Sequence, residues 1–416
     1  MPVTSIERLQ TLYDVTLALS SELDLQVLLP AVIDQVISVT GAERGFLMLG
    51  SSTDDLEFHV ARGLDQETIA SPEFEISRGV VERVAESGQS VLTVDAQTEG
   101  WLADRKSIHT LNLRSLMCVP LMVKRRAIGL VYVDNRMQAG IFTTDDLALL
   151  EAIASSAAVA IENARLYGLA VEQARMEREL ELASGLQAAL IPAHPPAIPG
   201  LELAGRWHTA LEVAGDFYDF IPRNDGRLVV VIGDVTDKGV PAAFFMGLAR
   251  TTIRASLAAD LSLKQAIEQA NRLLCADSSG GMFVTLYAIS VDPSQWQIEA
   301  VCAGHNPPLI VRKKGKTIDD LPGGAMPLGI LEDQAYPATS FHLERDEFLL
   351  LYTDGVPDAV NPAGEFYGLE RLHKILAKAQ RHAPEQALTM IHDDVRAFAD
   401  GQAPYDDLTL VGLRRV

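Results

Sequence analysis

A long helical pattern occupies the middle of the chain. Apolar and small residues recur at helical spacing over residues 144–192, and no proline interrupts them before Pro192. Thr144 suits the N-cap position, and Asp145 and Asp146 follow in the first turn, where carboxylates favour the positive end of the helix dipole. The pattern therefore predicts one helix that starts at Thr144 and ends at the proline-rich run opened by Pro192.

Within this helix the apolar residues follow a heptad rhythm that changes phase once. The first seam steps by four and three through Ile153, Ala157, Ala160, Ala164, Tyr167, Val171 and Ala174. After a slip near residues 174–176 the stripe resumes on Met176, Leu180, Ala183 and Leu190, with polar Gln187 on the same row. The first half fits equally a helix lying on its own domain and a seam between two chains, whereas residues 172–190 favour a parallel dimer seam.

The segment before this helix predicts an α+β domain. Residues 5–39 have the pattern of two amphipathic helices interrupted around residues 20–24, and residues 79–87 that of one short helix. Alternating apolar positions predict strands at 45–49, 56–62, 90–94, 115–123 and 127–135. An antiparallel sheet with helices before and after it accounts for this order.

The segment after the helix is rich in strands. A stiff connector with prolines at 192, 195, 196 and 199 leads into it. Strands are predicted at 201–207, 215–221, 227–234, 282–292, 295–303, 307–312, 347–354 and 408–414, and two pairs of helices at 240–259 with 262–275 and at 369–379 with 384–399. Two antiparallel sheets packed face to face and covered by helices fit this order.

Composition and charge narrow the class of protein. A chain of 416 residues is too long for one ordinary core and indicates two or three domains. The net charge of -21 argues against binding to nucleic acid or to an anionic membrane. There is no apolar run of the roughly 18 residues that a membrane span needs and no secretory signal, so we expect a cytoplasmic protein. Cys118, Cys275 and Cys302 lack metal-site spacing and are expected to be buried, reduced thiols.

Aspartates stand at the ends of several apolar strands in the C-terminal half. They are Asp216 and Asp219 in AGDFYDF, Asp234 in VVVIGD, Asp354 in LLLYTDG, and Asp406 and Asp407 in YDDLTLV. Aspartate often ends a strand, so each one alone could be an ordinary turn residue. Brought together, however, carboxylates repel one another and are stable only with cations, and hard oxygen ligands select Mg²⁺ or Mn²⁺. The set as a whole predicts a shared metal site.

Over about residues 20–167 the order of motifs resembles GAF domains. The matching segments are RGFLML, ARG, SGQSVLTVD, RSLMCVPLMVKRRAIGLVYVDN and FTTDDLALLEAIASSAAVAIENARLY. The resemblance implies a pocket over the sheet that could take a small ligand, although many GAF domains only dimerise. Cys118 lies within a predicted strand, which argues against a bilin thioether. His59 and His109 could ligate haem iron, but a solvated loop or strand-edge histidine is the commoner case.

Over about residues 176–416 the chain resembles the SpoIIE/RsbU branch of PPM metal-dependent serine/threonine phosphatases. The motifs, in family order, are ERELELASGLQAALIP, EVAGDFYDF, VVVIGDVTDKGVPAAFFMG, MFVTLYAI, AGHNPPLIV, PLGI, LLLYTDGVPDA and YDDLTLVGLRR. The resemblance implies two Mn²⁺ or Mg²⁺ ions bound by Asp216, Asp234, Asp354 and Asp406, with the Val235 carbonyl as a further ligand. It implies neighbouring or outer positions for Asp219 and Asp407.

Two departures from that branch keep an alternative open. Ala214 stands where a glycine is usual, and Thr236-Asp237 replaces the common Ser-Gly. Asp237 could perturb metal affinity, join the site or pair with Lys238. A pseudophosphatase that binds a partner without hydrolysis, under control of a GAF ligand, is therefore the alternative to an enzyme. His305, in AGHNPP, is a candidate general acid but suits a structural loop role better.

The expected organisation is α+β with two domains. Residues 1–165 form a GAF sensor domain with its N-terminal helix, residues 166–191 a coiled-coil linker helix, and residues 192–416 a PPM-type αββα sandwich. The resemblance implies a GAF-regulated phosphatase that acts on a phosphorylated STAS-domain anti-anti-sigma protein in a partner-switching pathway. A homodimer through the linker helix is expected, with no nucleic acid and no membrane as partner.

Overall fold

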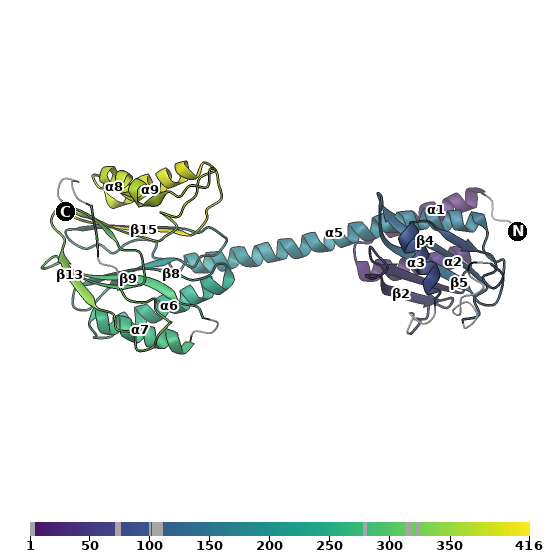
Figure 1. The fold of residues 1–416 in the computed structure, drawn as a ribbon, viewed down its shortest axis with the longest axis horizontal. Helices are drawn as coiled ribbons and strands as arrows, with labels where there is room; N and C mark the ends of the chain where they lie inside the picture. The colour runs from purple at the N-terminus through teal and green to yellow at the C-terminus, as the bar shows by residue number, and fades with distance from the viewer. Residues whose placement is uncertain are drawn as a thin grey trace. The chain divides into compact units, whose positions relative to one another are not determined.

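The chain folds into two compact units, Met1–Met176 and Glu177–Val416, which are described separately below. The computed structural model describes residues 5–70, 76–99, 101, 111–277, 281–312, 318–321 and 324–416. Figure 1 shows the helices and strands in chain order. Both units mix helices with antiparallel sheets, which confirms the two-domain α+β prediction.

The N-terminal unit is built on one five-stranded antiparallel sheet in the order β2-β1-β5-β4-β3. Its strands are β1 (Arg44–Leu49), β2 (Glu57–Gly63), β3 (Val91–Thr93), β4 (Ser115–Val123) and β5 (Arg126–Asn135). Its helices are α1 (Ser5–Ser20), α2 (Leu25–Thr40), α3 (Arg78–Ser87) and the first part of α5 (Thr144–Ala188). All five predicted strands and the predicted helices are present within one or two residues of their expected bounds.

Alternation along the strands sends side chains into two separate cores. In β1, Leu47 packs with Val32 of α2 and Ile153 of α5, whereas Phe46 packs with Val80 of α3 on the opposite face. Successive side chains of a strand point to opposite faces, so one apolar strand supplies both cores. The sheet is therefore covered on both sides, which explains the near-continuous apolar character of β1, β4 and β5.

The N-cap residue of helix α5 differs by one position from the sequence prediction. The cap is Thr143, not Thr144 as predicted, because the Thr143 hydroxyl accepts from the Asp146 backbone N–H at 3.3 Å while Asp146 accepts from the Thr143 backbone N–H at 3.0 Å. Such a reciprocal pair satisfies two backbone donors that the first turn leaves without helical partners. Both threonines fit a cap by composition, and only the backbone geometry distinguishes them.

The apolar seam of α5 divides into a buried and an exposed part. Ile153, Ala157, Ala160 and Ala164 are 0–5% exposed in the core of the N-terminal unit. Beyond them, Tyr167 and further apolar side chains are about half exposed. The first half of the helix is therefore a core helix of its own domain, which is one of the two interpretations that the sequence left open. By length and hydropathy α5 passes the test for a membrane span, but 44% of its apolar window is buried inside the protein.

The C-terminal unit is a sandwich of two five-stranded sheets, in the orders β13-β10-β9-β8-β7 and β12-β11-β14-β15-β6. The strands are β6 (Leu201–His208), β7 (Phe217–Pro222), β8 (Leu228–Val235), β9 (Val284–Asp292), β10 (Gln297–Ala303), β11 (Leu309–Val311), β12 (Ile318–Asp320), β13 (Ala338–His342), β14 (Phe348–Tyr352) and β15 (Leu408–Arg415). Two were not predicted as strands. The edge strand β13 is mostly exposed and lacks the alternation that marks a half-buried strand.

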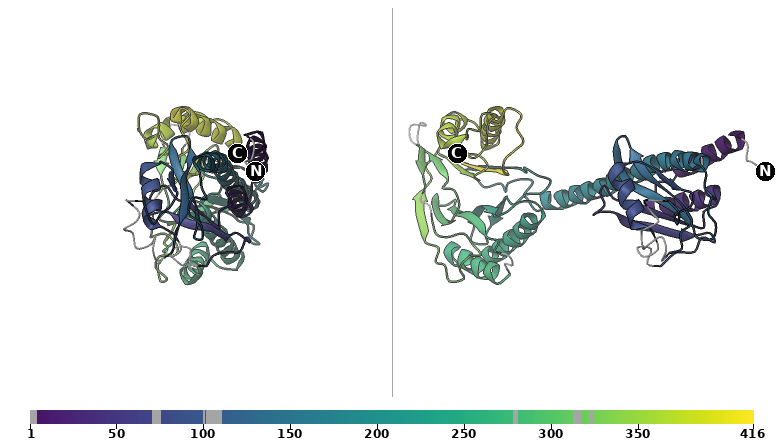
Figure 2. Two further views of the ribbon diagram at one scale, coloured as in Figure 1. Left: turned by 90° about the vertical axis from the view of Figure 1, so that its right-hand side faces the viewer. Right: turned by 45° about the vertical axis from the view of Figure 1, so that its right-hand side comes forward.

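Two helix pairs cover the outer faces of this sandwich (Figures 1 and 2). α6 (Val240–Ala258) and α7 (Leu263–Asp277) pack on the first sheet, and α8 (Gly368–Ala379) and α9 (Pro384–Ala399) on the second. In β14, Leu349 and Leu351 enter the core between the sheets, while Phe348 and Leu350 pack under α8 and α9. The predicted αββα layering is confirmed, and it buries the strands whose ends carry the conspicuous aspartates.

Candidate metal centre

Both sheets of the C-terminal unit deliver carboxylates to the same region. Asp216 directly precedes β7 and Asp234 is the next-to-last residue of β8, and these two strands pair so that Phe217 faces Gly233. Asp354 follows β14 by two residues, and Asp406 precedes β15 by two. Because β14 pairs antiparallel with β15, the end of the one lies beside the start of the other. Four residues spread over 190 positions of sequence (406 minus 216) are thereby gathered into one group.

Two glycines allow the strand ends to come this close. A Cβ atom at Gly355 would lie 1.9 Å from the carbonyl oxygen of Asp407, and one at Gly215 would lie 2.9 Å from that of Val235. Both distances are shorter than any side chain tolerates, so only glycine fits at either position. Gly355 lets the turn after β14 contact the residues before β15. Gly215, which directly precedes Asp216, lets the backbone lie against the Val235 carbonyl.

Asp216 is the most deeply buried carboxylate of the group. It is 1% exposed, and its Oδ2 accepts hydrogen bonds of 2.7 Å from the hydroxyls of both Thr353 and Thr409. Burial, followed by the charges of Asp234 and Asp407, raises its pKa well above the ordinary value, although the two threonine bonds act in the opposite direction. Both hydroxyls bond to Oδ2 and neither to Oδ1, and together they fix the orientation of the Asp216 carboxylate.

The other carboxylates also carry charge that the protein does not neutralise. Burial and then the charges of Asp354 and Asp406 raise the pKa of Asp234 to about 7. Burial and then Asp406 likewise raise the pKa of Asp354. The cation in contact with the group is Lys238, whose Nζ lies 2.9 Å from Oδ2 of Asp406. One lysine against four carboxylates leaves an excess of negative charge, which is the electrostatic signature of a cation site.

These residues fit one or two hard divalent ions held loosely by protein. Carboxylate and carbonyl oxygens are the donors that Mg²⁺ and Mn²⁺ prefer, and no sulfur or imidazole lies in the group. Among the described residues no three carboxylate, imidazole or thiolate side chains are close enough to enclose a single ion. Mg²⁺ usually retains several waters and takes only one or two carboxylates from the protein. Two ions that share the four aspartates and complete their coordination with water are compatible with this geometry.

Asp407 holds two backbone segments in place. Its Oδ1 accepts from the backbone N–H of Ala210 at 2.7 Å, and its Oδ2 from that of Gly215 at 2.8 Å. Both oxygens are therefore occupied by protein donors. The sequence predicted an outer position for Asp407, and the structure places it beside the group, where it anchors the loop that carries Asp216.

Asp219, for which a neighbouring or outer position was predicted, pairs with arginines of α6. It is fully buried, and its Oδ2 lies 2.6 Å from Nη1 of Arg254 and 2.8 Å from Nη2 of Arg250, both on α6. Asp216 and Asp219 are three positions apart, and an odd offset places two side chains on opposite faces of an extended segment. Asp219 ties α6 to β7 instead of facing the metal-binding region.

Asp237, one of the two departures from the family pattern, lies in an exposed turn. It is exposed, it has a φ of +76°, and its Oδ1 accepts from the backbone N–H of Lys238 at 3.2 Å. The Lys238 side chain pairs with Asp406 rather than with Asp237. A left-handed backbone at this position explains why glycine would fit it well. The expected pairing of Asp237 with the Lys238 side chain is therefore not found, and an effect of Asp237 on metal affinity stays a prediction.

His305 lies behind the group and is uncharged at neutral pH. Its Nδ1 is 2.8 Å from the hydroxyl of Thr285, which in turn donates to the carbonyl oxygen of Asp234 at 3.3 Å. Burial lowers the pKa of His305 to about 4. A general acid must carry its proton at the working pH, so this residue supports the β8 end structurally, which agrees with the sequence interpretation.

Gln187, near the end of α5, is a positioning residue that sequence reasoning did not identify as functional. Its side-chain Nε2 donates to the carbonyl oxygen of Ala214 at 2.7 Å, and its Oε1 accepts from the Ala214 backbone N–H at 2.9 Å. The amide is 5% exposed. The signal was present in the sequence as a polar residue on an otherwise apolar row. Ala214 stands two residues before Asp216, so the helix is bonded to the loop that carries the deepest carboxylate.

Two cavities of the N-terminal unit differ in size: an open one of about 460 Å³ is lined by Glu82, Arg83 and Trp101. The cavity beneath α3, lined by Val84, Leu130 and neighbours, measures about 10 Å³, less than one water molecule needs. His59 is exposed on β2, His109 lies outside the described residues, and burial raises the pKa of the Cys118 thiol. All three cysteines are free, with Cys118 and Cys302 buried and Cys275 partly exposed.

Known families match both units. The GAF domain family matches residues 24–161, and the family described as Stage II sporulation protein E (SpoIIE) matches residues 224–416. Protein IcfG of Synechocystis is 29% identical over 264 residues, which cover 57% of this chain and 41% of that protein. Phosphoserine phosphatase RsbU of Bacillus subtilis is 26% identical over 243 residues, covering 58% of this chain and 72% of that protein.

A solved structure shares the fold of the C-terminal unit. The SiaA-PP2C domain of Pseudomonas aeruginosa superposes with a TM-score of 0.52 at 22% identity, covering 59% of this chain and 99% of that domain. This likeness concerns the fold alone. Because the chain spans well under half the length of IcfG, the activity of the whole protein has to be argued from its own residues.

Proposed function

We propose that this chain, which joins a GAF domain to a SpoIIE-type phosphatase domain, is a metal-dependent protein serine/threonine phosphatase. The observation that carries the proposal is the gathering of Asp216, Asp234, Asp354 and Asp406 from both sheets, with raised pKa values on three of them. Similarity to a protein named a phosphoserine phosphatase supports the same conclusion.

In this proposal the four aspartates and the Val235 carbonyl would hold two Mn²⁺ or Mg²⁺ ions. Such ions supply a water of lowered pKa as nucleophile and offset the negative charge of the phosphoryl oxygens. The protein then contributes orientation. Thr353 and Thr409 fix the Asp216 carboxylate, and no cysteine or serine nucleophile is required.

The alternative of a pseudophosphatase loses its main support. It rested on Ala214 and Asp237, and Asp237 is exposed and bonded to its own turn. Ala214 contributes backbone atoms, which bind Gln187 and would do so with any side chain at this position. Neither departure removes a carboxylate from the group.

Manganese-dependent hydrolysis of p-nitrophenyl phosphate by the full chain tests the activity. We expect turnover that Asp354→Asn abolishes, because the amide removes one of the four charges. Asp393→Asn is the matched control, since the Asp393 side chain is 68% exposed on α9 and should leave turnover unchanged. Absence of turnover at every Mn²⁺ and Mg²⁺ concentration would refute the enzyme and favour the binding module.

We infer that the substrate is a phosphorylated STAS-domain protein of a partner-switching pathway in the cytoplasm. The support is the similarity to RsbU, together with the acidic net charge of -21, which disfavours nucleic acid. Release of phosphate from candidate phospho-STAS proteins, compared with p-nitrophenyl phosphate, measures this selectivity. Equal rates on unrelated phosphoproteins would contradict it.

We further propose that α5 carries regulation from the GAF domain and dimerises the protein. The contact of Gln187 with Ala214 supports the first part, because any shift of the helix end would move the loop that holds Asp216. Half-exposed apolar side chains along α5 support the second. They are Leu166, Tyr167, Leu169, Val171, Met176, Leu182 and Leu186.

Three experiments separate these parts. Gln187→Leu should lower turnover at limiting Mn²⁺ by up to about 30-fold, since two hydrogen bonds of roughly 1 kcal/mol each are lost. Tyr167→Glu with Val171→Glu should convert dimer to monomer in sedimentation velocity. An insertion of three or four residues near 174–176, where the heptad phase slips, should uncouple any GAF signal from activity. Regulation that survives the insertion would make the helix a spacer.

A further inference from the structure

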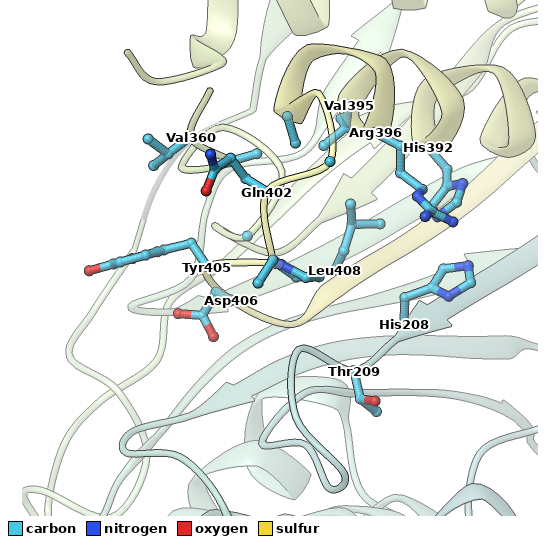
Figure 3. A pocket seen from close by; sticks show the side chains of 16 residues that line it. His208, Thr209, Val360, His392, Val395, Arg396, Gln402, Tyr405, Asp406 and Leu408 are labelled. Carbon is cyan, nitrogen blue, oxygen red and sulfur yellow. The ribbon is translucent and has the colours of Figure 1, made fainter. Parts of the chain in front are cut away.

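A cavity of about 340 Å³ lies beside the proposed metal centre, and its wall includes Asp406. It is enclosed by the end of β6, the helix α9 and the loop that leads to β15. Figure 3 shows Asp406 and Tyr405 at one side of it and His208 and His392 at the other. An occupant of this cavity would therefore sit next to the reacting phosphate.

The cavity has one strong positive charge. Of the described residues that line it, Arg396 is the only arginine or lysine and Asp406 the only carboxylate. Asp406 is engaged by Lys238 at 2.9 Å and belongs to the metal-binding group. Arg396 is exposed and pairs with no carboxylate among the residues that the structure describes. Its charge is thus available to an incoming anion.

Two histidines stand close to this arginine. The rings of His208 and His392 stack with centroids 4.3 Å apart and planes inclined by 23°. Nδ1 of His392 lies 3.1 Å from the exposed Asp393 carboxylate. Burial, and then His392 and the nearby arginines, lower the pKa of His208. The ring N–H groups of these imidazoles are hydrogen-bond donors that an anion could accept from.

The remaining wall is mostly apolar. Its aliphatic side chains are those of Ala359, Val360, Val395, Ala399, Ala403 and Leu408, and Thr209 and Gln402 add polar atoms. A group that fills such a cavity needs an aliphatic stem and an anionic end. Glutamate has both, and a planar guanidinium binds a carboxylate with two parallel hydrogen bonds.

We propose that this cavity is a specificity subsite that takes an acidic side chain of the phosphoprotein substrate, close in sequence to the phosphorylated residue, with Arg396 as the residue that recognises it. The inference deepens the proposed phosphatase function and rests on it. A chain with a net charge of -21 repels acidic segments in general. Arg396 therefore determines at which position, relative to the phosphorylated residue, the substrate can carry an acidic side chain.

Peptide kinetics with the full-length protein and Mn²⁺ test the subsite. The substrates are phosphoserine peptides that differ only in one glutamate, placed in turn at each position around the phosphoserine, and their glutamine counterparts. The wild type should prefer glutamate at one or two positions by about tenfold in kcat/KM, the size expected for one charge-assisted pair. Arg396→Gln should remove that preference through a higher KM with kcat preserved, because the lost contact binds ground state and transition state alike.

Three controls make the result decisive. Arg345→Gln changes an exposed arginine elsewhere on the same domain and should keep the preference. Arg396→Glu should favour lysine over glutamate at the same positions. Hydrolysis of p-nitrophenyl phosphate, which has no second anion, should be equal in all variants and shows that they are folded. The subsite is refuted if the wild type shows no glutamate preference, or if Arg396→Gln retains it, while p-nitrophenyl phosphate is hydrolysed; no hydrolysis at all overturns the phosphatase proposal itself.

Discussion

Asp216 and Asp219 stand three residues apart, and the structure predicts that the same substitution at each has opposite consequences. Asp219→Asn removes a buried charge from Arg250, which is 12% exposed, and from Arg254, which is 47% exposed. Breaking a buried pair costs about 3–5 kcal/mol of unfolding free energy, because the remaining charge is left without a partner. Only one of the two arginines is deeply buried, so we expect the lower end, about 3 kcal/mol.

Asp216→Asn should instead raise the free energy of unfolding in the absence of metal. Burial and neighbouring carboxylates raise the pKa of Asp216, so the folded state holds its proton more tightly than the unfolded state. The unfolding free energy of the wild type therefore falls as the pH rises from about 4 toward that raised pKa. The amide cannot ionise and escapes this loss.

Added Mn²⁺ distinguishes the two variants in a second way. A ligand at 100 times its dissociation constant stabilises the folded state by about 2.7 kcal/mol. Asp219→Asn should keep this increment in full, and Asp216→Asn should lose it. Urea unfolding followed by tryptophan fluorescence measures both quantities. A Trp101→Phe background leaves Trp207 and Trp296, so the signal reports the C-terminal unit alone.

The reasoning is refuted by one clear pattern. If Asp219→Asn weakens the stabilisation by Mn²⁺ while the metal-free unfolding free energy is unchanged, Asp219 is a ligand and its pairing with α6 is incidental. Thr389→Val is a suitable reference variant, since it alters a half-buried hydroxyl on α9 distant in sequence from both aspartates. It should move neither quantity by more than about 1 kcal/mol.

Two further predictions concern the surroundings of the group. Asp237→Gly should raise the unfolding free energy by about 0.5–1 kcal/mol in urea titrations, because it relieves a left-handed backbone with φ of +76°, and a decrease would show that the Asp237 turn is preferred as it stands. His305 has its pKa lowered from 6.5 to about 4, so the unfolded chain takes up the proton first and stability is lost as the pH falls through that interval, by about 3 kcal/mol. His305→Asn should flatten the pH dependence of unfolding by that amount between pH 6.5 and 4, and an unchanged profile would contradict the buried, neutral state.

Much of this arrangement follows from local patterns in the sequence. Apolar strands that end in aspartate predicted which carboxylates meet, because antiparallel pairing places strand ends and starts side by side. Period-two alternation from Asp216 also assigns Asp219 to the other face of an extended segment, which agrees with its pairing to α6.

Other features depend on contacts between distant residues. Lys238 pairs with Asp406, which is 168 positions away (406 minus 238), rather than with its neighbour Asp237. Thr353 and Thr409 look like ordinary strand residues until the two sheets bring their hydroxyls to Asp216. The first half of the α5 seam was ambiguous for the same reason. An apolar residue such as Ile153 suits burial against its own sheet and burial against a second chain equally well.

The insertion of β15 between β14 and β6 has a consequence for the timing of synthesis. The strand that completes the second sheet, and the Asp406 that precedes it, are translated 190 residues after Asp216 (406 minus 216). At typical elongation rates that interval is roughly 10–40 s. Throughout it the nascent chain has Asp216 without its Thr409 partner and lacks one carboxylate of the group. A nascent chain therefore cannot assemble the complete carboxylate group until β15 has entered the middle of the sheet.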